Sequence, residues 1–261
     1  MVDLAGKNVW ITGASSGLGA ALAQQCLDAG ARVLLSARRA DRLEVLAQGR
    51  SNVEVLPLDL AATGTLPERA SEALRRMGAI DVMIHNAGIG QRGLVHESSI
   101  DVERRLMEVN FLGPVALTKA ILPSMLARNQ GEFVIISSVL GMMSVKRRAG
   151  YCASKHALHG YFNALRAEVH EHGLSVLLVC PGHIDSEFSQ QALSADGSAH
   201  GVNEAGSRAG LSPGECARLT LRALERGRAE VYPAKWESLG VYLNRYAPAL
   251  MRRAAANMKA R

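Results

Sequence analysis

The sequence predicts an α/β fold in which a doubly wound parallel β-sheet lies between two layers of helices, three layers in all. Short aliphatic runs alternate with longer helical patterns along the chain, and this alternation is typical of parallel strands joined by right-handed helical crossovers. Hydrophobic residues make up 48% of the 261 residues and aromatic residues only 4%. Aliphatic side chains must therefore fill the core, which suits strands that are buried on both faces.

Seven short apolar runs are predicted to be strands, because each is rich in aliphatic residues and is bounded by turn or helix signals. In chain order they are Asn8–Ile11, Arg32–Ser36, Val53–Leu58, Asp81–His85, Phe133–Ser137, Ser175–Cys180 and Glu230–Tyr232. Helical patterns separate them over Gly17–Ala29, Arg39–Gly49, Gly64–Met77, Ile100–Arg128 and Tyr151–His172. A further helix is expected to begin at Ser212-Pro213, because serine is a good N-cap and proline suits the first helical position.

Two segments have less regular patterns. Residues 182–210 are rich in Ser, Gly, Ala and Asp, which predicts a mobile substrate loop, or a lid with short helices. The tail 236–261 is helix-like and basic. We expect it to pack on the domain or on a second subunit, and contact with a membrane surface is the alternative.

The composition limits the class of protein. We expect a single domain over residues 1–261, because the chain can bury one large core and no long linker divides it. The four cysteines are scattered without a CxxC pair, which indicates free thiols and a cytoplasmic location. We expect no signal peptide and no integral membrane segment, since no run reaches the ~18 apolar residues of a span. The net charge of +6 fits nucleic acid, a membrane surface, an anionic small molecule or simply a solvated surface.

The first predicted strand leads into the glycine-rich run Thr12-Gly13-Ala14-Ser15-Ser16-Gly17-Leu18-Gly19. Glycines allow a tight turn and a close approach of backbone to a pyrophosphate, and the N-terminus of the following helix attracts anions. After the first strand of a βαβ unit, this run predicts a Rossmann-type dinucleotide-binding loop, although its spacing is GxxxGxG rather than GxGxxG. A plain turn is the alternative.

The second strand ends in Ala37-Arg38-Arg39 and lacks the acidic residue that binds the adenosine ribose of NAD. Because an arginine fork binds phosphate oxygens in two places, Arg38 with Arg39 predicts NADP(H). An ordinary surface pair is the alternative. Asp59, after the third strand, can accept a hydrogen bond from the adenine amino group or cap a helix.

Polar runs also follow the later strands. They are His85-Asn86-Ala87-Gly88, Ser137-Ser138 and Cys180-Pro181-Gly182-His183-Ile184-Asp185-Ser186. Ligands bind at the carboxyl ends of the strands in an open α/β sheet. We therefore expect one cleft at that edge.

Tyr151 and Lys155 lie four residues apart on a predicted helix and share a face. A lysine beside a phenol lowers its pKa from the ordinary value of ~10, which allows acid-base chemistry near neutral pH. Ser138, at a strand end, can face this phenol across a cleft. Taken alone, the pair also fits an exposed helix face.

Together these residues resemble the short-chain dehydrogenase/reductase family over roughly residues 5–232. The matching positions are Thr12-Gly13-xxx-Gly17-x-Gly19, Asp59, Asn86-Ala87-Gly88, Asn110, Ser138, Tyr151-xxx-Lys155 and Pro181-Gly182. Ser137–Val169 further resembles the 11β-hydroxysteroid dehydrogenase-like branch. Two positions depart from the family: Ser186 stands where many members have threonine, and His85 where many have a second asparagine.

The resemblance implies hydride transfer between NADP(H) and a ketone, aldehyde or secondary alcohol. Tyr151 would be the acid-base residue, and Ser138 would bind the substrate oxygen. Lys155 would lower the pKa of Tyr151 and hold the nicotinamide ribose. Asn110 would relay protons between Lys155 and solvent, or make only an internal hydrogen bond. The cofactor would contact Gly13, Ser15, Ser16, Gly17, Leu18, Gly19, Arg38, Arg39, Asp59, Leu60, Asn86, Ala87, Gly88, Tyr151, Lys155, Pro181, Gly182, Ile184 and Ser186.

The substrate is less defined by the sequence. Its candidate pocket walls, which could equally be core residues, are Leu140, Met142, Met143, Val145, His183 and Phe188. Adaptable methionines suit a lipophilic carbonyl compound. The run Lys146-Arg147-Arg148 either attracts an acidic or phosphorylated substrate or forms a solvated turn. We expect no metal site, because the histidines suit a helix surface: His156, His159, His170 and His172.

In the family, helices equivalent to Ile100–Arg128 and Tyr151–His172 often pair between subunits, which implies a homodimer or homotetramer. A non-catalytic NADP(H)-binding redox sensor or scaffold is the second hypothesis, and the intact Ser138, Tyr151 and Lys155 oppose it. Nucleic acid is not an expected partner, because no basic motif is interleaved with aromatic residues.

Overall fold

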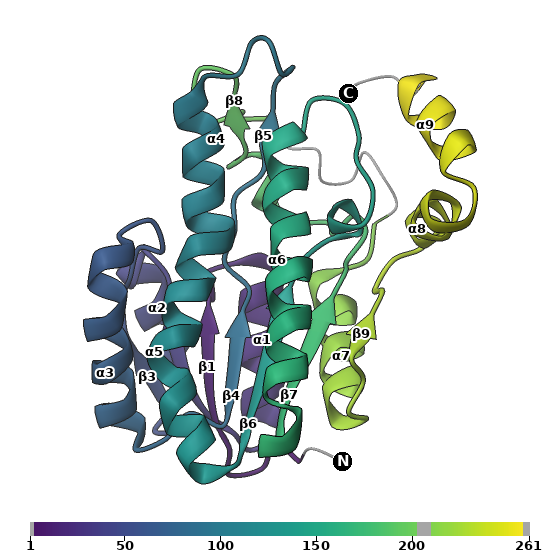
Figure 1. Ribbon diagram of the computed structural model, residues 1–261. Helices are drawn as coiled ribbons and strands as arrows, with labels where there is room; N and C mark the ends of the chain where they lie inside the picture. Colours follow the sequence, from purple (N-terminus) through teal and green to yellow (C-terminus); the bar gives the residue numbers. More distant parts are fainter. Residues whose placement is uncertain (1–2, 203–209, 258–261) are drawn as a thin grey trace.

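The computed structural model describes residues 3–202 and 210–257. Its centre is a seven-stranded sheet in the order β3-β2-β1-β4-β6-β7-β9, and every neighbouring pair is parallel. The strand order reverses between β1 and β4, so the predicted doubly wound, Rossmann-type α/β fold is confirmed (Figure 1). The strands are β1 Asn8–Thr12, β2 Arg32–Ser36, β3 Val53–Val55, β4 Val82–His85, β6 Gly131–Ile136, β7 Leu174–Val179 and β9 Glu230–Val231.

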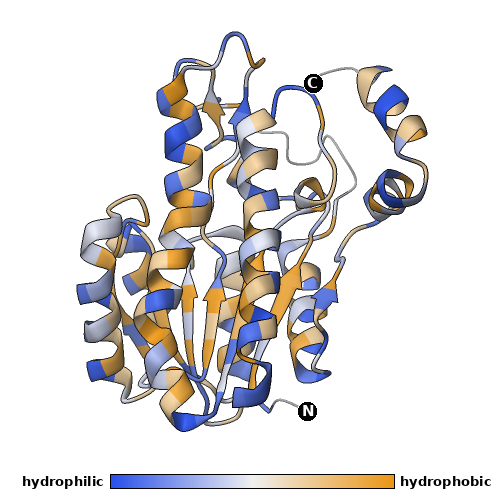
Figure 2. Cartoon of the chain, viewed as in Figure 1, coloured by the Kyte–Doolittle hydropathy of each residue, from blue (hydrophilic) through white to orange (hydrophobic). Residues whose placement is uncertain are grey.

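Helices cover both faces of the sheet, and Figure 2 shows the apolar strands between them. One face carries α1 Gly17–Asp28, α2 Ala40–Ala47 and α7 Pro213–Glu225. The other carries α3 Leu66–Met77, α5 Gly113–Arg128 and α6 Ala149–Glu168.

Consecutive residues of β1 supply the cores on both faces. Trp10 packs beneath α3, α5 and α6, whereas Val9 and Ile11 pack beneath α1, α2 and α7, and all three are fully buried. Side chains alternate across a strand. A strand covered on both faces therefore needs an apolar residue at each position, which explains the aliphatic runs in the sequence.

The segment predicted as one helix over Ile100–Arg128 is divided. A π-helical turn, Glu108–Leu112, joins α4 Ile100–Met107 to α5. Such turns occur often at functional sites, and this one contains the buried Asn110.

One helical segment of the described residues, again Ile100–Arg128, is long and apolar enough to cross a membrane. This corrects the prediction that no run is apolar enough. The core helix of a soluble protein passes the same test, and α5 buries Leu117, Ile121 and Met125 in the core above the sheet.

The described part of the substrate loop has more regular structure than predicted. It contains a 3-10 turn, Glu187–Ser189, and a short strand, β8 Leu193–Ser194. β8 pairs with β5 Gln91–Arg92 in a second parallel sheet of two strands. Strands of two residues have no detectable periodicity, so they could not be predicted. The rest of the predicted loop, residues 203–209, lies outside the described residues.

The tail is helical, as predicted, and its described part forms two helices, α8 Glu237–Tyr246 and α9 Pro248–Asn257. Pro248 disfavours a helical conformation at the residue before it, which explains the break. Val241 and Met251 are buried in a cluster that also contains Met143. The tail therefore packs on the domain, as the first of the two alternatives predicted.

Candidate active site

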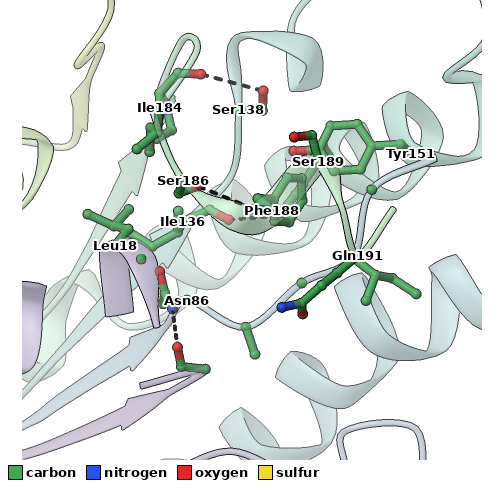
Figure 3. Close-up of a pocket in the computed structure, with 18 of the residues that line it drawn as sticks. Leu18, Asn86, Ile136, Ser138, Tyr151, Ile184, Ser186, Phe188, Ser189 and Gln191 are labelled. Atoms are coloured by element: carbon green, nitrogen blue, oxygen red, sulfur yellow. Dashed lines mark hydrogen bonds between the residues drawn. The ribbon is translucent and has the colours of Figure 1, made fainter. Parts of the chain in front are cut away.

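A cavity of about 740 Å³ lies at the carboxyl edge of the main sheet, and its size is typical of ligand pockets. The polar runs that follow β1, β2, β4, β6 and β7 all contribute to its wall, and Figure 3 shows part of them. Every residue predicted to contact the cofactor lines this cavity: Gly13, Ser15, Ser16, Gly17, Leu18, Gly19, Arg38, Arg39, Asp59, Leu60, Asn86, Ala87, Gly88, Tyr151, Lys155, Pro181, Gly182, Ile184 and Ser186.

The glycine loop has the form that a pyrophosphate requires. Gly13 has a φ of +68°, and a Cβ there would lie 2.7 Å from the Cα of Ala87. A Cβ on Gly19 would overlap the carbonyl oxygen of Gly13. The first residues of α1 line the cavity, and no side chain caps this helix end at Ser16. The positive end of the helix dipole therefore faces the cavity. These residues fit a dinucleotide phosphate.

Asn86, at the end of β4, holds the glycine loop in place. Its Nδ2 donates to the carbonyl oxygens of Thr12 (3.0 Å) and Gly13 (3.2 Å). Its backbone N–H donates to the hydroxyl of Thr12 at 3.1 Å. Asn86 therefore fixes the backbone of the loop in addition to lining the cavity.

The two arginines after β2 have different positions. Arg39 is half-buried, and its Nη2 donates to the hydroxyls of Ser15 (3.0 Å) and Ser16 (3.1 Å). Arg38 is exposed at the cavity wall. The guanidinium of Arg39 thus braces the glycine loop, while that of Arg38 is the more accessible to a ligand.

Asp59 makes the contacts of a turn as well as lining the cavity. Its Oδ1 accepts the backbone N–H of Ala61 at 3.0 Å, and its Oδ2 pairs with Arg105 at 3.3 Å. The next helical segments have Ala62 and Thr65 as their N-caps, so the alternative that Asp59 caps a helix is wrong, and contact with adenine stays a prediction.

Tyr151, Ser138 and Lys155 meet in the same cavity. Tyr151 is 8% exposed and Lys155 is 4% exposed, so the alternative of an exposed helix face is wrong. The Nζ of Lys155 lies 5.8 Å from the centre of the Tyr151 ring and donates to the carbonyl oxygen of Ile136 at 2.8 Å. Ser138 lies near enough to Tyr151 to lower the pKa of its phenol, and the Oγ of Ser138 accepts the backbone N–H of Leu140 at 3.1 Å.

The pKa of Tyr151 differs from the expectation. Burial raises it, while Ser138 and the charges of Arg148 and Arg92 lower it. Lys155 was expected to lower this pKa, but burial dominates. Burial also lowers the pKa of the Lys155 ammonium to about 8. The phenol thus keeps its proton at neutral pH, in the form that can protonate a carbonyl oxygen.

Burial of Lys155 is expected to cost stability, so the Lys155→Met variant should be more stable than the wild type. Below a pH of about 8 the lysine is charged in both the folded and unfolded states, and the folded state bears the whole desolvation cost. We expect a gain of about 1 to 3 kcal/mol at pH 7 in the free energy of unfolding. The variant also loses the hydrogen bond from Lys155 to Ile136. The gain in free energy is therefore smaller than the full pKa shift would give.

The gain should shrink as the pH rises above about 8 and vanish near 10.5, the ordinary pKa of lysine, because the unfolded state alone then binds the proton. Urea unfolding at several pH values measures it. Lys119→Met, at an exposed position of α5, is the control and should change little. An unchanged or lower stability of Lys155→Met at pH 7 would contradict the prediction.

Asn110 lies behind the cavity wall, in the π-helical turn. Its Oδ1 accepts the backbone N–H of Ile89 (2.8 Å), and its Nδ2 donates to the oxygens of Ile89 (3.0 Å) and Ser154 (3.0 Å). A Cβ on Gly88 would lie 3.2 Å from Oδ1 and 3.6 Å from the Nζ of Lys155. The internal hydrogen bonds given as an alternative are present, and the proton relay stays a prediction.

The substrate side of the cavity contains five of the six predicted wall residues, namely Leu140, Met143, Val145, His183 and Phe188. Met142 is not part of the wall, which corrects that prediction. Its carbonyl oxygen accepts a hydrogen bond from Asn244 of α8 instead. The ring of Phe188 meets the ring of Tyr151 edge-on, with centres 6.1 Å apart, as Figure 3 shows.

Sequence patterns did not single out the wall residues Gly90, Gln91, Arg92, Gln191, Lys235, Trp236 and Glu237. Gln91 is the most informative of them. Its Oε1 accepts the backbone N–H of Tyr151 at 3.2 Å, and its Nε2 donates to Glu103 at 2.9 Å. Gln91 lies three positions after Gly88, the last residue of a predicted cofactor-binding run. This short distance in the sequence was the signal that could have placed Gln91 at the cavity.

Behind the site, three groups with metal-ligating atoms come together. The ligand atoms of His159, Cys180 and Glu230 all lie within 4.8 Å of one another. They also lie near enough to interact directly, with Cys180 Sγ 3.6 Å from the Nε2 of His159 and 3.7 Å from the Oε1 of Glu230. Within the described chain, His159 is thus buried rather than on a helix surface, and the absence of a metal stays a prediction. All four cysteines are free, as predicted.

The comparison with known families agrees with this geometry. A family described as short chain dehydrogenase matches residues 7–197, most of the chain. The chain belongs to this family. Dehydrogenase/reductase SDR family member 7B of Bos taurus is 43% identical to this short-chain dehydrogenase over 95% of the chain and 80% of the relative.

Solved structures show the same fold. A short-chain dehydrogenase from Streptomyces avermitilis has a TM-score of 0.83 and 29% identity, covering 97% of this chain and 98% of its own. Another from Burkholderia cenocepacia, solved in complex with NADP, has a TM-score of 0.84 and 25% identity, covering 98% of this chain and all of its own. This short-chain dehydrogenase is accordingly an oxidoreductase with a nicotinamide dinucleotide cofactor.

Proposed function

We propose that this short-chain dehydrogenase is an NADP(H)-dependent oxidoreductase that interconverts a ketone or aldehyde with the corresponding alcohol. The observation that carries the proposal is the buried group of Ser138, Tyr151 and Lys155, which shares one cavity with the glycine loop. The phenol of Tyr151 and the hydroxyl of Ser138 line this cavity, where a carbonyl oxygen could approach both, and the ammonium of Lys155 lies 5.8 Å from the centre of the Tyr151 ring. Oxidation of NADPH across a panel of carbonyl compounds tests the proposal.

In the reducing direction, bound NADPH supplies a hydride to the carbonyl carbon. The phenol of Tyr151 gives its proton to the carbonyl oxygen, and the phenolate remains. The hydroxyl of Ser138, which lines the same cavity as Tyr151, can donate to the same oxygen as negative charge develops there. The buried ammonium of Lys155 favours the phenolate that forms, and Asn110 would connect Lys155 to solvent for return of the proton.

The preference for NADP(H) over NAD(H) is supported by the cationic end of the cavity. Arg38 and Arg39 stand there and no acidic residue follows β2 directly. A guanidinium binds a 2′-phosphate through two hydrogen bonds. The phosphate would meet Arg38 first, because Arg39 already donates to the serines of the glycine loop.

Arg38→Asp is expected to reverse this preference. The carboxylate repels a 2′-phosphate and can accept a ribose hydroxyl, so the ratio of kcat/KM for NADPH to that for NADH should fall about 100-fold or more. Steady-state kinetics with both cofactors measure the ratio. Arg50→Asp makes the same change of charge outside the cavity wall and should leave the ratio unaltered. An unaltered ratio in Arg38→Asp would show that the phosphate does not bind there.

We also propose that the substrate is lipophilic, that the protein is cytoplasmic and that it is a homodimer or homotetramer. The apolar wall residues Leu140, Met143 and Val145 support a lipophilic substrate, and the four free cysteines support a cytoplasmic location. The oligomer is supported by α5 and α6, which lie on one face of the sheet. Light scattering of the purified protein would give its mass.

A further inference from the structure

The first turn of α6 lacks a side-chain cap of its own. Its N-cap, Arg148, makes no capping hydrogen bond with its side chain. Tyr151 is the third residue of this helix, so its backbone N–H has no partner within the helix. Gln91 of β5 supplies the partner from 60 positions earlier in the chain, since its Oε1 accepts this N–H at 3.2 Å. The side chain of Gln91 thus caps the helix at Tyr151 itself.

The amide of Gln91 has only one orientation that satisfies its surroundings. Its Nε2 donates to the Oε1 of Glu103 in α4 at 2.9 Å and to the hydroxyl of Ser98 at 3.4 Å. A backbone N–H can only donate and a carboxylate can only accept, so a flipped amide would lose the bonds to Tyr151 and Glu103. Gln91 is 1% exposed, and unpaired polar groups are costly when they are buried. Glu103 therefore fixes the amide oxygen toward Tyr151.

Glu103 also lies directly against the first turn of α6. A Cβ on Gly150 would overlap the Oε2 of Glu103 and would lie 3.0 Å from Leu106 of α4. Glycine at position 150 thus allows α4 to approach the helix one residue before Tyr151. Leu106 and Tyr151 belong to one buried apolar cluster, which holds the two helices together. The pair of Gln91 and Glu103 is consequently part of the packing that places Tyr151.

Backbone hydrogen bonds on both sides of Gln91 hold β5 in place. The carbonyl oxygen of Gly90 accepts the N–H of Leu193 in β8 at 2.9 Å. The N–H of Gly93 donates to the carbonyl oxygen of Arg147 at 3.1 Å. β8 belongs to the predicted substrate loop, and Arg147 lies in the turn before α6. Gln91 is therefore anchored between the substrate loop and the start of α6.

We infer that Gln91 is a positioning residue for the proposed acid: its bond to the N–H of Tyr151 sets where the phenol lies in the cavity, and Glu103 fixes the amide that makes this bond. The inference rests on the proposed function and adds a residue to the same site. A phenol must lie within hydrogen-bond reach of the carbonyl oxygen to give it a proton, and a displacement of about 1 Å can cost about 100-fold in rate. Gln91 acts through the backbone and needs no contact with the substrate.

The position of Tyr151 is tested first without turnover. Gln91→Met removes the side-chain hydrogen bonds and keeps the length of the side chain. Amide hydrogen exchange followed by NMR should show the Tyr151 N–H exchanging at least about 10-fold faster relative to the N–H of Val134. Val134 is fully buried in the central strand β6 and reports global unfolding. Gln48→Met, at an exposed position outside the cavity wall, should leave this ratio unchanged. An unchanged ratio in Gln91→Met would overturn the inference.

Kinetics test the effect on the reaction. In Gln91→Met, kcat for reduction of the best carbonyl compound of the panel should fall about 10- to 100-fold. The Kd for NADPH should change little, because Gln91 is not among the residues expected to contact the cofactor. A purely structural loss would lower the amount of folded enzyme and leave the single-turnover rate of the folded part unchanged. Gln48→Met should retain full kcat.

An exchange of the two side chains gives a matched rescue. Gln91→Glu alone brings a second carboxylate to Glu103 and should lower kcat about 10-fold or more. The double variant Gln91→Glu/Glu103→Gln restores an acceptor for Tyr151 and an amide donor between the two side chains, so most of kcat should return. Full kcat in Gln91→Met, or no recovery in the double variant, would overturn the inference and leave the reductase intact. A wild-type protein that reduces no carbonyl compound would contradict the proposed function, and hydrogen exchange would still decide whether Gln91 positions Tyr151.

Discussion

Replacement of Tyr151 by phenylalanine is expected to lower kcat for NADPH-dependent carbonyl reduction by about 100- to 10,000-fold, the contribution of a positioned general acid. The change removes one hydroxyl and keeps the ring, so the edge-on contact with Phe188 and the fold should persist. The proton would then have to come from water, and the effect of Ser138 on the phenol would be lost. Single-turnover measurements at saturating NADPH separate this chemical step from binding.

Tyr161→Phe, which removes a hydroxyl from the same helix, is the matched control, because Tyr161 packs against Phe111 and Phe162 away from the cavity wall. It should retain nearly full activity. Full activity in Tyr151→Phe would exclude the mechanism. A wild-type protein that binds NADPH tightly and reduces no carbonyl compound would instead favour the redox sensor or scaffold.

Replacement of Gly19 by alanine is expected to have the second large effect, a loss of about 1 to 3 kcal/mol in the free energy of unfolding, as for overpacking in a core. The added Cβ would overlap the carbonyl oxygen of Gly13 and would crowd Asn86. Relief requires movement of the glycine loop, so NADPH binding should also weaken about 10-fold or more. Thermal unfolding and fluorescence titration with NADPH measure the two effects.

Gly160→Ala is the control for the change from glycine to alanine. Gly160 is exposed within α6, and nothing lies within 4 Å of a Cβ built there. Alanine is the better helix former, so this variant should gain about 0.5 to 1 kcal/mol. A Gly19→Ala variant as stable as the wild type, with unchanged NADPH affinity, would show that the loop relaxes without cost.

Much of the fold could be predicted because its signals are local. The aliphatic run at Arg32–Ser36 coincides with β2, and serine before proline marks the start of α7 at Ser212, whose hydroxyl accepts the N–H of Glu215 at 3.1 Å. The third strand was predicted too long, since it ends at Val55 before Pro57, and proline has no N–H to pair. Packing, which a local pattern does not contain, decided the π-helical turn around Asn110.

The sequence by itself determined the parallel sheet, the glycine loop after β1 and the candidate catalytic group of Ser138, Tyr151 and Lys155, because strand ends in such a sheet share one edge. Only the tertiary structure decided the protonation of that group. Burial outweighs the neighbouring charges and raises the pKa of Tyr151, and the extent of burial depends on chain segments distant in the sequence. The structure also brought Gln91 to Tyr151, through the bond between the Gln91 side chain and the Tyr151 N–H. No periodicity or spacing encodes such a contact, since it joins a strand of two residues to a helix residue 60 positions later.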